Sequence, residues 1–149
     1  MTDFLLPVAF SFQVRFTGDT GKEDIAFHEV SGLEAEIELE LVTEGGENRF
    51  QHKLPKPVKH PNLILKRGVA SKSSGLVTWF KQVIENDFSK PIEPRSVTIM
   101  LNDEEGEPLR TWSIARAYPV KWSIDTFNAM ENKIAIETLE LAYTTLKRL

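Results

Sequence analysis

The chain has 149 residues, of which 41% are hydrophobic and 27% charged, and its formal net charge is −4. This length is typical of one domain, 1–149, and the balanced charge argues against nucleic-acid binding by the whole surface. The absence of cysteine excludes a disulfide framework, a thiolate metal site and a cysteine nucleophile. The start of the chain lacks a basic segment and Pro7 interrupts its apolar run, so we expect cytoplasmic synthesis, no signal peptide and no membrane anchor.

Alternating apolar residues predict three strands in the first third of the chain. The first is 9–16, and a turn follows it at 17–24. The second is 25–33, with a bulge or tight bend at Ser31-Gly32. The third and most regular strand is 33–42, in which every second residue is a glutamate: Glu34, Glu36, Glu38 and Glu40.

The segment 43–61 predicts a long protruding loop. Gly45-Gly46 ends the preceding strand, and prolines, which cannot donate to a strand ladder, recur at Pro55, Pro57 and Pro61. Residues 29–47 contain seven acids and no base, whereas residues 48–72 contain seven bases and no acid. Such adjacent blocks indicate either a hairpin whose halves pair with each other or self-association between copies.

The rest of the chain predicts more strands and one amphipathic helix. The helix is 73–87, with Ser73 or Ser74 as its N-cap. Strands are expected at 62–68, 96–101, 109–117, 118–127 after a proline break, and 132–146 with a slip near Thr138; a hairpin turn with a glycine bulge joins 96–101 to 109–117. The predicted fold is therefore mainly β, an antiparallel barrel or sandwich with one packed helix.

No pattern of catalytic or metal-binding residues is present. His52 and His60 have no carboxylate between them, and His28 and Glu29 are adjacent strand residues that point to opposite faces. The acids of 104–107 lack the spacing of a calcium loop, and the four glutamates of 33–42 rise in one line with none distinguished. We expect no enzyme activity, no metal and no cofactor.

A longer succession of motifs is more specific. The strand ending in "FHEVSGLEAEIE" is followed by "EGGENRFQHKLPKPVKHPNLILKRG", a helix containing "TWF", "LNDEEGEPLRTWSIARAYPVKW", and a last strand at 134–142. In this order and spacing, over about 10–143, the chain resembles the tube proteins of contractile phage tails and of phage-tail-like contractile injection systems. Each motif alone is weak, and their order carries the resemblance.

The resemblance implies a structural protein. Family members form hexameric rings that stack into a hollow tube, with strands of each subunit joining a barrel around the lumen. A contractile sheath surrounds the tube, and baseplate, tape-measure or cap proteins contact it. DNA or protein cargo passes through the lumen. The resemblance thus implies a virion component, or part of an injection particle, that serves translocation.

The resemblance also suggests roles for the charged residues. The glutamates of 33–42 would line the lumen, while Leu33, Ala35, Ile37, Leu39 and Leu41 would face the subunit's own core. The open alternative is that the glutamates form an outer solvated face. The segment 43–61 would reach neighbouring subunits, with these contact candidates: Glu44, Glu47, Arg49, Phe50, Lys53, Lys56 and Lys59. The turn 103–107 could supply acidic partners.

Two other functions fit the residues. One is a specialised paralogue of the same family that starts the tube at the baseplate or caps it. The other is a monomeric β-barrel that binds a small ligand inside, which the large predicted core disfavours: Phe10, Phe12, Trp79, Phe80, Trp112 and Trp122. The state of the polymer distinguishes all three.

Overall fold

The computed structural model describes residues 11–17, 24–43, 45, 52–68, 75–86, 91–125 and 135–149, which form ten strands and one helix. In chain order the elements are β1 (Ser11–Phe16), β2 (Asp24–Phe27), β3 (Glu29–Ser31), β4 (Glu36–Val42), β5 (His52–Lys59), β6 (Leu63–Gly68), α1 (Gly75–Glu85), β7 (Arg95–Asn102), β8 (Pro108–Ile124), β9 (Ile136–Ala142) and β10 (Thr145–Arg148). The mainly β, antiparallel fold with one helix is therefore confirmed. Among the described residues, no helix could span a membrane.

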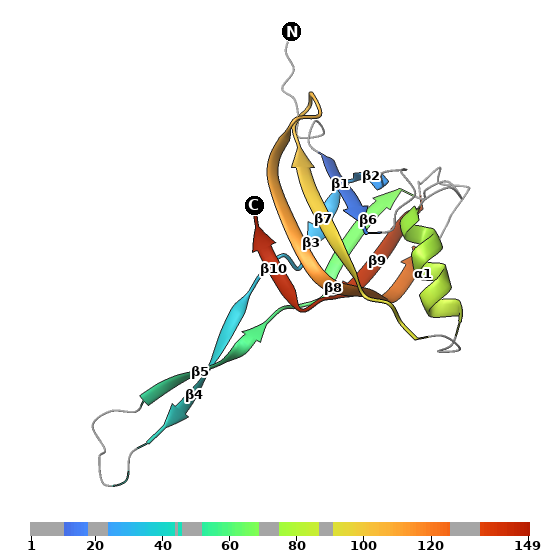
Figure 1. The fold of residues 1–149 in the computed structure, drawn as a ribbon. Coiled ribbons are helices and arrows are strands. Elements are labelled where there is room, and N and C mark those ends of the chain that lie inside the picture. The colour runs from blue at the N-terminus through green and yellow to red at the C-terminus, as the bar shows by residue number, and fades with distance from the viewer. Residues whose placement is uncertain are drawn as a thin grey trace.

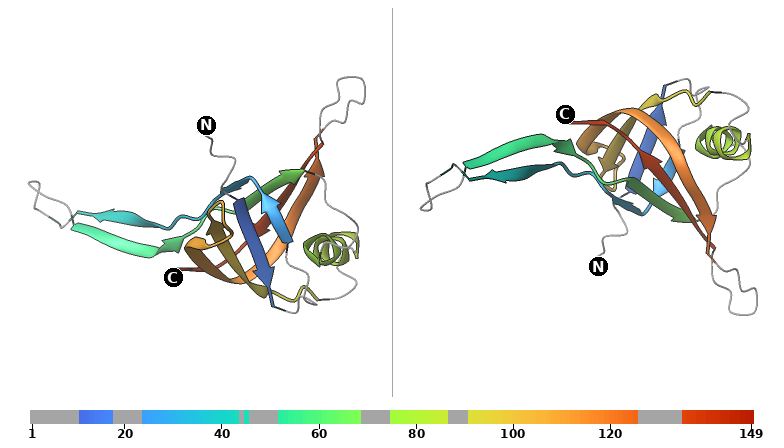
Figure 2. Two further views of the ribbon diagram at one scale, coloured as in Figure 1. Left: turned by 90° about the horizontal axis from the view of Figure 1, so that it is seen from above. Right: turned by 90° about the horizontal axis from the view of Figure 1, so that it is seen from below.

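The body of the molecule is one strongly curved sheet (Figures 1 and 2). Its strands follow the order β2–β1–β7–β8–β9–β6–β3, with β10 paired to β8 beside this path. The two ends of the path, β2 and β3, are separated in the chain only by His28, whose backbone N–H donates to the carbonyl of Lys66. The sheet therefore curls around a single core in the manner of a barrel.

Strand β8 corrects one sequence prediction. We expected a break at Pro119, but 108–124 is one strand that pairs with β7 up to Ala117 and with β9 from Tyr118 onwards. Arg116 has a φ of 57° at this exchange of partners, and the β9 ladder shifts register between Pro119 and Lys121. Proline is tolerated here because the strand bends and bulges where its neighbour changes.

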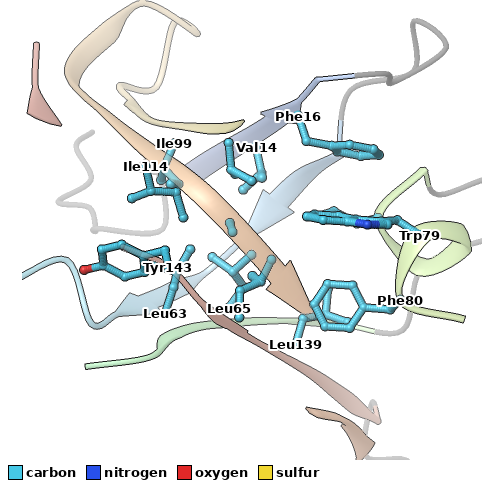
Figure 3. Close-up of a cluster of buried hydrophobic side chains, with 14 of the residues drawn as sticks. Val14, Phe16, Leu63, Leu65, Trp79, Phe80, Ile99, Ile114, Leu139 and Tyr143 are labelled. Carbon is cyan, nitrogen blue, oxygen red and sulfur yellow. The ribbon is translucent and has the colours of Figure 1, made fainter. Parts of the chain in front are cut away.

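The core lies between the inner faces of this sheet and helix α1 (Figure 3). Trp79 and Phe80 of α1 are buried, and the Trp79 ring stacks on Phe16 with centroids 5.2 Å apart. Each fully buried aliphatic or aromatic side chain contributes about 1.5–3 kcal/mol to folding. The fully buried strand residues include Val14, Leu63, Leu65, Ile99, Ile114, Leu139 and Leu141.

Two predictions about the core were wrong. Trp122 is 44% exposed rather than buried. In β9 the inward positions are Glu137, Leu139 and Leu141, and the β6–β9 ladder runs without a slip at Thr138. The apolar Ile136 therefore points outward, because the buried Glu137 pairs inside with Arg67.

Strands β4 and β5 form a separate two-stranded sheet, called the ribbon below, that projects from the body (Figures 1 and 2). The loop predicted over 43–61 is thus wrong for 52–59, which is strand β5. Pro55 and Pro57 fit this strand because a two-stranded ribbon leaves one edge of each strand unpaired. The register also shifts opposite them, between Ile37 and Leu39 of β4.

Candidate functional site

One face of the ribbon is apolar and open to solvent. Ile37, Leu39 and Leu41 are 54%, 52% and 59% exposed. Directly opposite residues of an antiparallel pair share a face, so Val58, opposite Ile37, and Pro55, opposite Leu39, extend this surface. The prediction that these β4 side chains face the chain's own core was wrong; only Leu33, before the ribbon, packs against it. Apolar and charged residues alternate in β4 as predicted, but the ribbon projects from the body, so neither of its faces packs against the core.

The other face of the ribbon is charged. It carries Glu36, Glu38 and Glu40, with Lys59 opposite Glu36. The Lys59 ammonium donates to the Glu38 carboxylate, and this bond and charge lower the pKa of Glu38, with a smaller contribution from Lys56. The same contact raises the pKa of Lys59. The acidic and basic blocks of the sequence therefore meet within one chain here, as the hairpin interpretation predicts.

The separation of the two faces is incomplete beyond the register shift. Leu54 stands opposite Glu40 on the charged face, and Lys53 stands opposite Leu41 on the apolar face. At the prolines β5 also lacks backbone N–H donors, so its outer edge is a poor template for a further strand. The ribbon therefore presents side-chain surfaces more readily than strand edges.

The root of the ribbon is fixed by Tyr143, which follows β9. Its hydroxyl donates to the carbonyl of Gly32 at 2.6 Å and lies 3.4 Å from that of Glu34. The His60 ring packs on the Tyr143 ring, and its Nδ1 donates to the same Glu34 carbonyl at 3.0 Å. Tyr143 thus ties the segments entering and leaving the ribbon to the body.

Gly32 permits this close approach. Its φ is +94°, and a Cβ at this position would lie 2.1 Å from the carbonyl oxygen of Asn62. The bend predicted at Ser31-Gly32 is therefore confirmed. Asn62 in turn donates from Nδ2 to the Glu140 carboxylate at 2.8 Å, so both chain segments at the root are anchored to the β9 region.

The remaining candidate residues divide into two groups. Lys53, Lys56 and Lys59 are exposed along β5, and Glu34 lies at the root of the ribbon. Four others lie outside the described residues: Glu44, Glu47, Arg49 and Phe50. Within the described part of the chain, no three His, Asp or Glu side chains gather as a metal site would require.

Sequence reasoning missed the apolar residues that β5 contributes. Leu54 and Val58 are 48% and 51% exposed, and they were assigned to a loop because of the surrounding prolines. Reading His52–Lys59 as a strand opposite 36–42 would have required accepting two prolines in it. The acidic and basic blocks were the available signal, since paired strands with opposite charges stabilise each other.

The fold of the chain is thus a curled antiparallel sheet with one helix and a projecting ribbon. Among solved structures, Hcp1 from Salmonella typhimurium shares this fold at 12% identity, with a TM-score of 0.57 over 93% of this chain and 85% of that chain. No curated protein matches the sequence.

Residues 8–147 match the family of the T4-like virus tail tube protein gp19, and the chain belongs to this family of structural tube proteins. A chain in the anti-feeding prophage baseplate is 31% identical, with a TM-score of 0.77 over 100% of this chain and 97% of that chain. A chain of the sheath–tube complex of the extracellular contractile injection system PVC, in its extended state, is 27% identical, with a TM-score of 0.74 over 99% and 93% of the two chains.

Proposed function

We propose that the chain is the inner-tube subunit of a contractile phage tail or contractile injection system, stacked as hexameric rings around a hollow lumen. Family membership and the similarity to chains of two contractile particles support this role. The observation that carries self-association is the apolar face of the ribbon. The isolated chain leaves that face in water, whereas a neighbouring copy would bury it.

The extent of this surface favours a partner on physical grounds. Its three β4 side chains are each more than half exposed, and they lie side by side with Val58. Contiguous exposed apolar patches of this kind mark interaction sites in soluble proteins. Removing them from water would favour association by about 25 cal/mol per Å² before the costs of ordering are subtracted.

The proposal assigns a different role to the charged face of the ribbon. Covering the apolar face leaves Glu36, Glu38 and Glu40 in water, with Glu34 at the root. In a ring, we assign this face to the lumen, where negative charge would keep DNA or acidic protein cargo from adhering. The lysines of β5 moderate the charge, because Lys59 already binds Glu38. Lys53 and Lys56 remain contact candidates at the edge of the ribbon.

The partners follow from the same assignment. The partner with the largest contact would be a second copy of the chain. The surface of the tube would contact a sheath protein, the baseplate, and tape-measure or cap proteins. Structures similar to this chain include a PVC sheath–tube terminator and an anti-feeding prophage cap. The role is structural rather than enzymatic, and it needs no cofactor.

Negative-stain electron microscopy of the purified chain at low and high concentration tests the proposal. We expect hollow rings or tubes. Leu39→Asp should give monomers with an unchanged Tm, because the side chain touches water in the monomer and apolar surface in the polymer. Glu40→Asn, next to it on the opposite face, is the matched control and should assemble. Monomers of the natural sequence at every concentration, or normal assembly of Leu39→Asp, would contradict the proposal.

A second candidate is a baseplate-proximal subunit that initiates the tube. The similarity to a chain of the anti-feeding prophage baseplate favours it. The same micrographs separate the two candidates. Long tubes indicate the main tube subunit, and discrete rings that do not stack at high concentration indicate the initiator.

A further inference from the structure

The exposed large apolar side chains of the described residues gather in two places. One is the ribbon, which holds Ile37, Leu39, Leu41, Val42, Leu54 and Val58. The other lies beside helix α1 and holds Ile84, Val120, Trp122 and Ile124. Outside these two, only Leu109 and Leu149 are comparably exposed among the described residues, and they are single. Within the described part of one chain, neither surface is covered by other residues.

The second surface is hollowed. One cavity of about 590 Å³ lies between Ile84 of α1 and Tyr118 and Val120 of β8. An adjoining cavity of about 250 Å³ lies between α1 and Trp122, with Phe80 at its base. Ile84 borders both cavities, and the two hollows together are called the α1–β8 groove below.

The ribbon and the α1–β8 groove lie on opposite sides of the body. In Figures 1 and 2 the ribbon leaves on one side, and α1 packs on the other. A projecting surface and a hollowed surface on opposite sides of one chain cannot meet within that chain. Two such surfaces on different copies can meet only head to tail, and a contact of that kind closes into a ring or continues as a filament according to the rotation at each step.

We infer that the α1–β8 groove receives the apolar face of the ribbon of a second copy. This inference rests on the proposed self-association and names the surface that the ribbon contacts. Leu39 and its neighbours would lie against Ile84 and Trp122, which are 43% and 44% exposed in the isolated chain. Trp residues dominate the binding energy of many interfaces, and Trp122 provides a broad, rigid contact.

The charges at the border of the groove suit this occupant. Lys81 and Glu85 of α1 line the cavity next to Trp122, so its rim has both signs of charge. The ribbon likewise carries both signs, from the glutamates of β4 and the lysines of β5. An apolar centre with a mixed polar rim on both partners is the usual anatomy of a protein interface. A purely acidic or basic partner would match this rim less well.

Site-specific photo-crosslinking tests the contact directly. The chain has no cysteine, so Leu39→Cys can carry a single benzophenone maleimide. The Leu39→Cys chain that carries benzophenone is enriched in ¹⁵N and is mixed with natural-abundance chain that carries no benzophenone. The mixture is irradiated under assembly conditions, and mass spectrometry identifies the crosslinked peptides. Isotope composition separates contacts between copies from contacts within one. We expect Leu39 to crosslink to a second copy at 77–85 or 118–124, and Glu38→Cys, on the opposite face of β4, to give much less of the same product.

The outcomes separate this inference from the proposed function. Crosslinks from Leu39 to another part of a second copy would overturn the groove assignment and leave self-association in place. No crosslink between copies, together with monomers in micrographs, would overturn both.

A helix variant gives an independent readout. Ile84→Glu places a charge in the groove, and we expect the concentration for half-assembly to rise at least about tenfold. Gln82→Glu adds the same charge on the same helix outside the groove and should assemble as the natural chain does. If Ile84→Glu forms normal tubes and loses only a contact with a sheath protein, the occupant is the sheath and the inference fails.

Discussion

Gly32 sets the point at which the ribbon leaves the body. With a φ of +94° and the Asn62 carbonyl 2.1 Å from the position of a Cβ, the site combines a left-handed backbone with a steric clash. We predict that Gly32→Ala lowers the free energy of unfolding by at least about 2 kcal/mol, measured by urea denaturation.

Gly106 is the matched control for this effect. Its φ is +83°, but nothing lies within 4 Å of the point that a Cβ would occupy, so Gly106→Ala should cost about 1 kcal/mol from backbone strain alone. The difference between the two variants isolates the clash with Asn62. Equal losses for both variants would show that the close approach has no energetic weight.

Tyr143 gives the ribbon root a dependence on alkaline pH. Burial raises the pKa of Tyr143 above its ordinary value near 10.0. Because the unfolded chain ionises first, the free energy of unfolding is unaffected by this group below about pH 10 and falls as the pH rises toward the folded pKa. Tyr143→Phe should remove this component of the decline, and at pH 8 it should cost about 1–3 kcal/mol through the unpaired Gly32 carbonyl.

Urea denaturation of both proteins at pH 8 and pH 10.5 measures this prediction. The stability gap between natural chain and variant should narrow at the higher pH. Tyr118→Phe is a suitable control, since no hydrogen bond of its hydroxyl occurs among the described residues. A constant gap would mean that Tyr143 titrates alike in the folded and unfolded chain.

At the scale of elements, strands β6 and β9 bury an ion pair. Arg67 and Glu137 stand opposite each other, with the guanidinium 3.6 Å from the carboxylate and 4.4 Å from the centre of the Phe27 ring. Removing one partner of a buried pair leaves a charge in the core. We predict a loss of about 3–5 kcal/mol for Glu137→Leu, measured by thermal or urea denaturation.

Replacing both members tests whether the pair itself stabilises the ladder. Arg67→Met with Glu137→Leu should recover most of that loss, because apolar side chains of similar volume can replace a buried ion pair. A double variant as unstable as Glu137→Leu would instead show that Arg67 is needed for its packing on Phe27.

The elements also show what could be predicted from the sequence. Strand positions such as β6, β7 and the helix α1 agree with the expected ranges within a few residues, because their apolar residues face the chain's own core. The same argument failed for β4, whose alternation is as regular but whose apolar side is exposed. Periodicity identifies the apolar face of a strand but does not identify what covers that face, which in the proposed assembly is another copy of the chain.

Buried charge and proline explain the other errors. The inward position of Glu137 could not be predicted, since it depends on Arg67, which lies 70 residues earlier in the chain. Pro55, Pro57 and Pro119 all lie in strands, at bends or free edges that only the pairing reveals. Along β5, the sequence named only the charged residues as contact candidates, which stays a prediction, and it did not name the exposed apolar residues between them.

For the whole molecule, the effect of salt on assembly depends on which face of the ribbon makes the contact between copies. In 1 M NaCl the Debye length is about 3 Å, so attraction between exposed charges is largely screened. We predict that assembly persists at this salt concentration, because the proposed contact is apolar. Light scattering and micrographs at 0.1 M and 1 M NaCl measure it, and dissolution of tubes at 1 M would place the contact on the charged face instead.

The closeness of the two segments at the ribbon root has a consequence for controlling polymer length. His60 Nδ1 lies 3.0 Å from the Glu34 carbonyl, so a short glycine-containing turn could replace 36–59 without disturbing the body. In the proposed head-to-tail geometry, such a shortened subunit would still accept a neighbour in its α1–β8 groove but could not engage the next one. It would act as a chain terminator, and its molar fraction in a mixture would set the mean size of the assemblies.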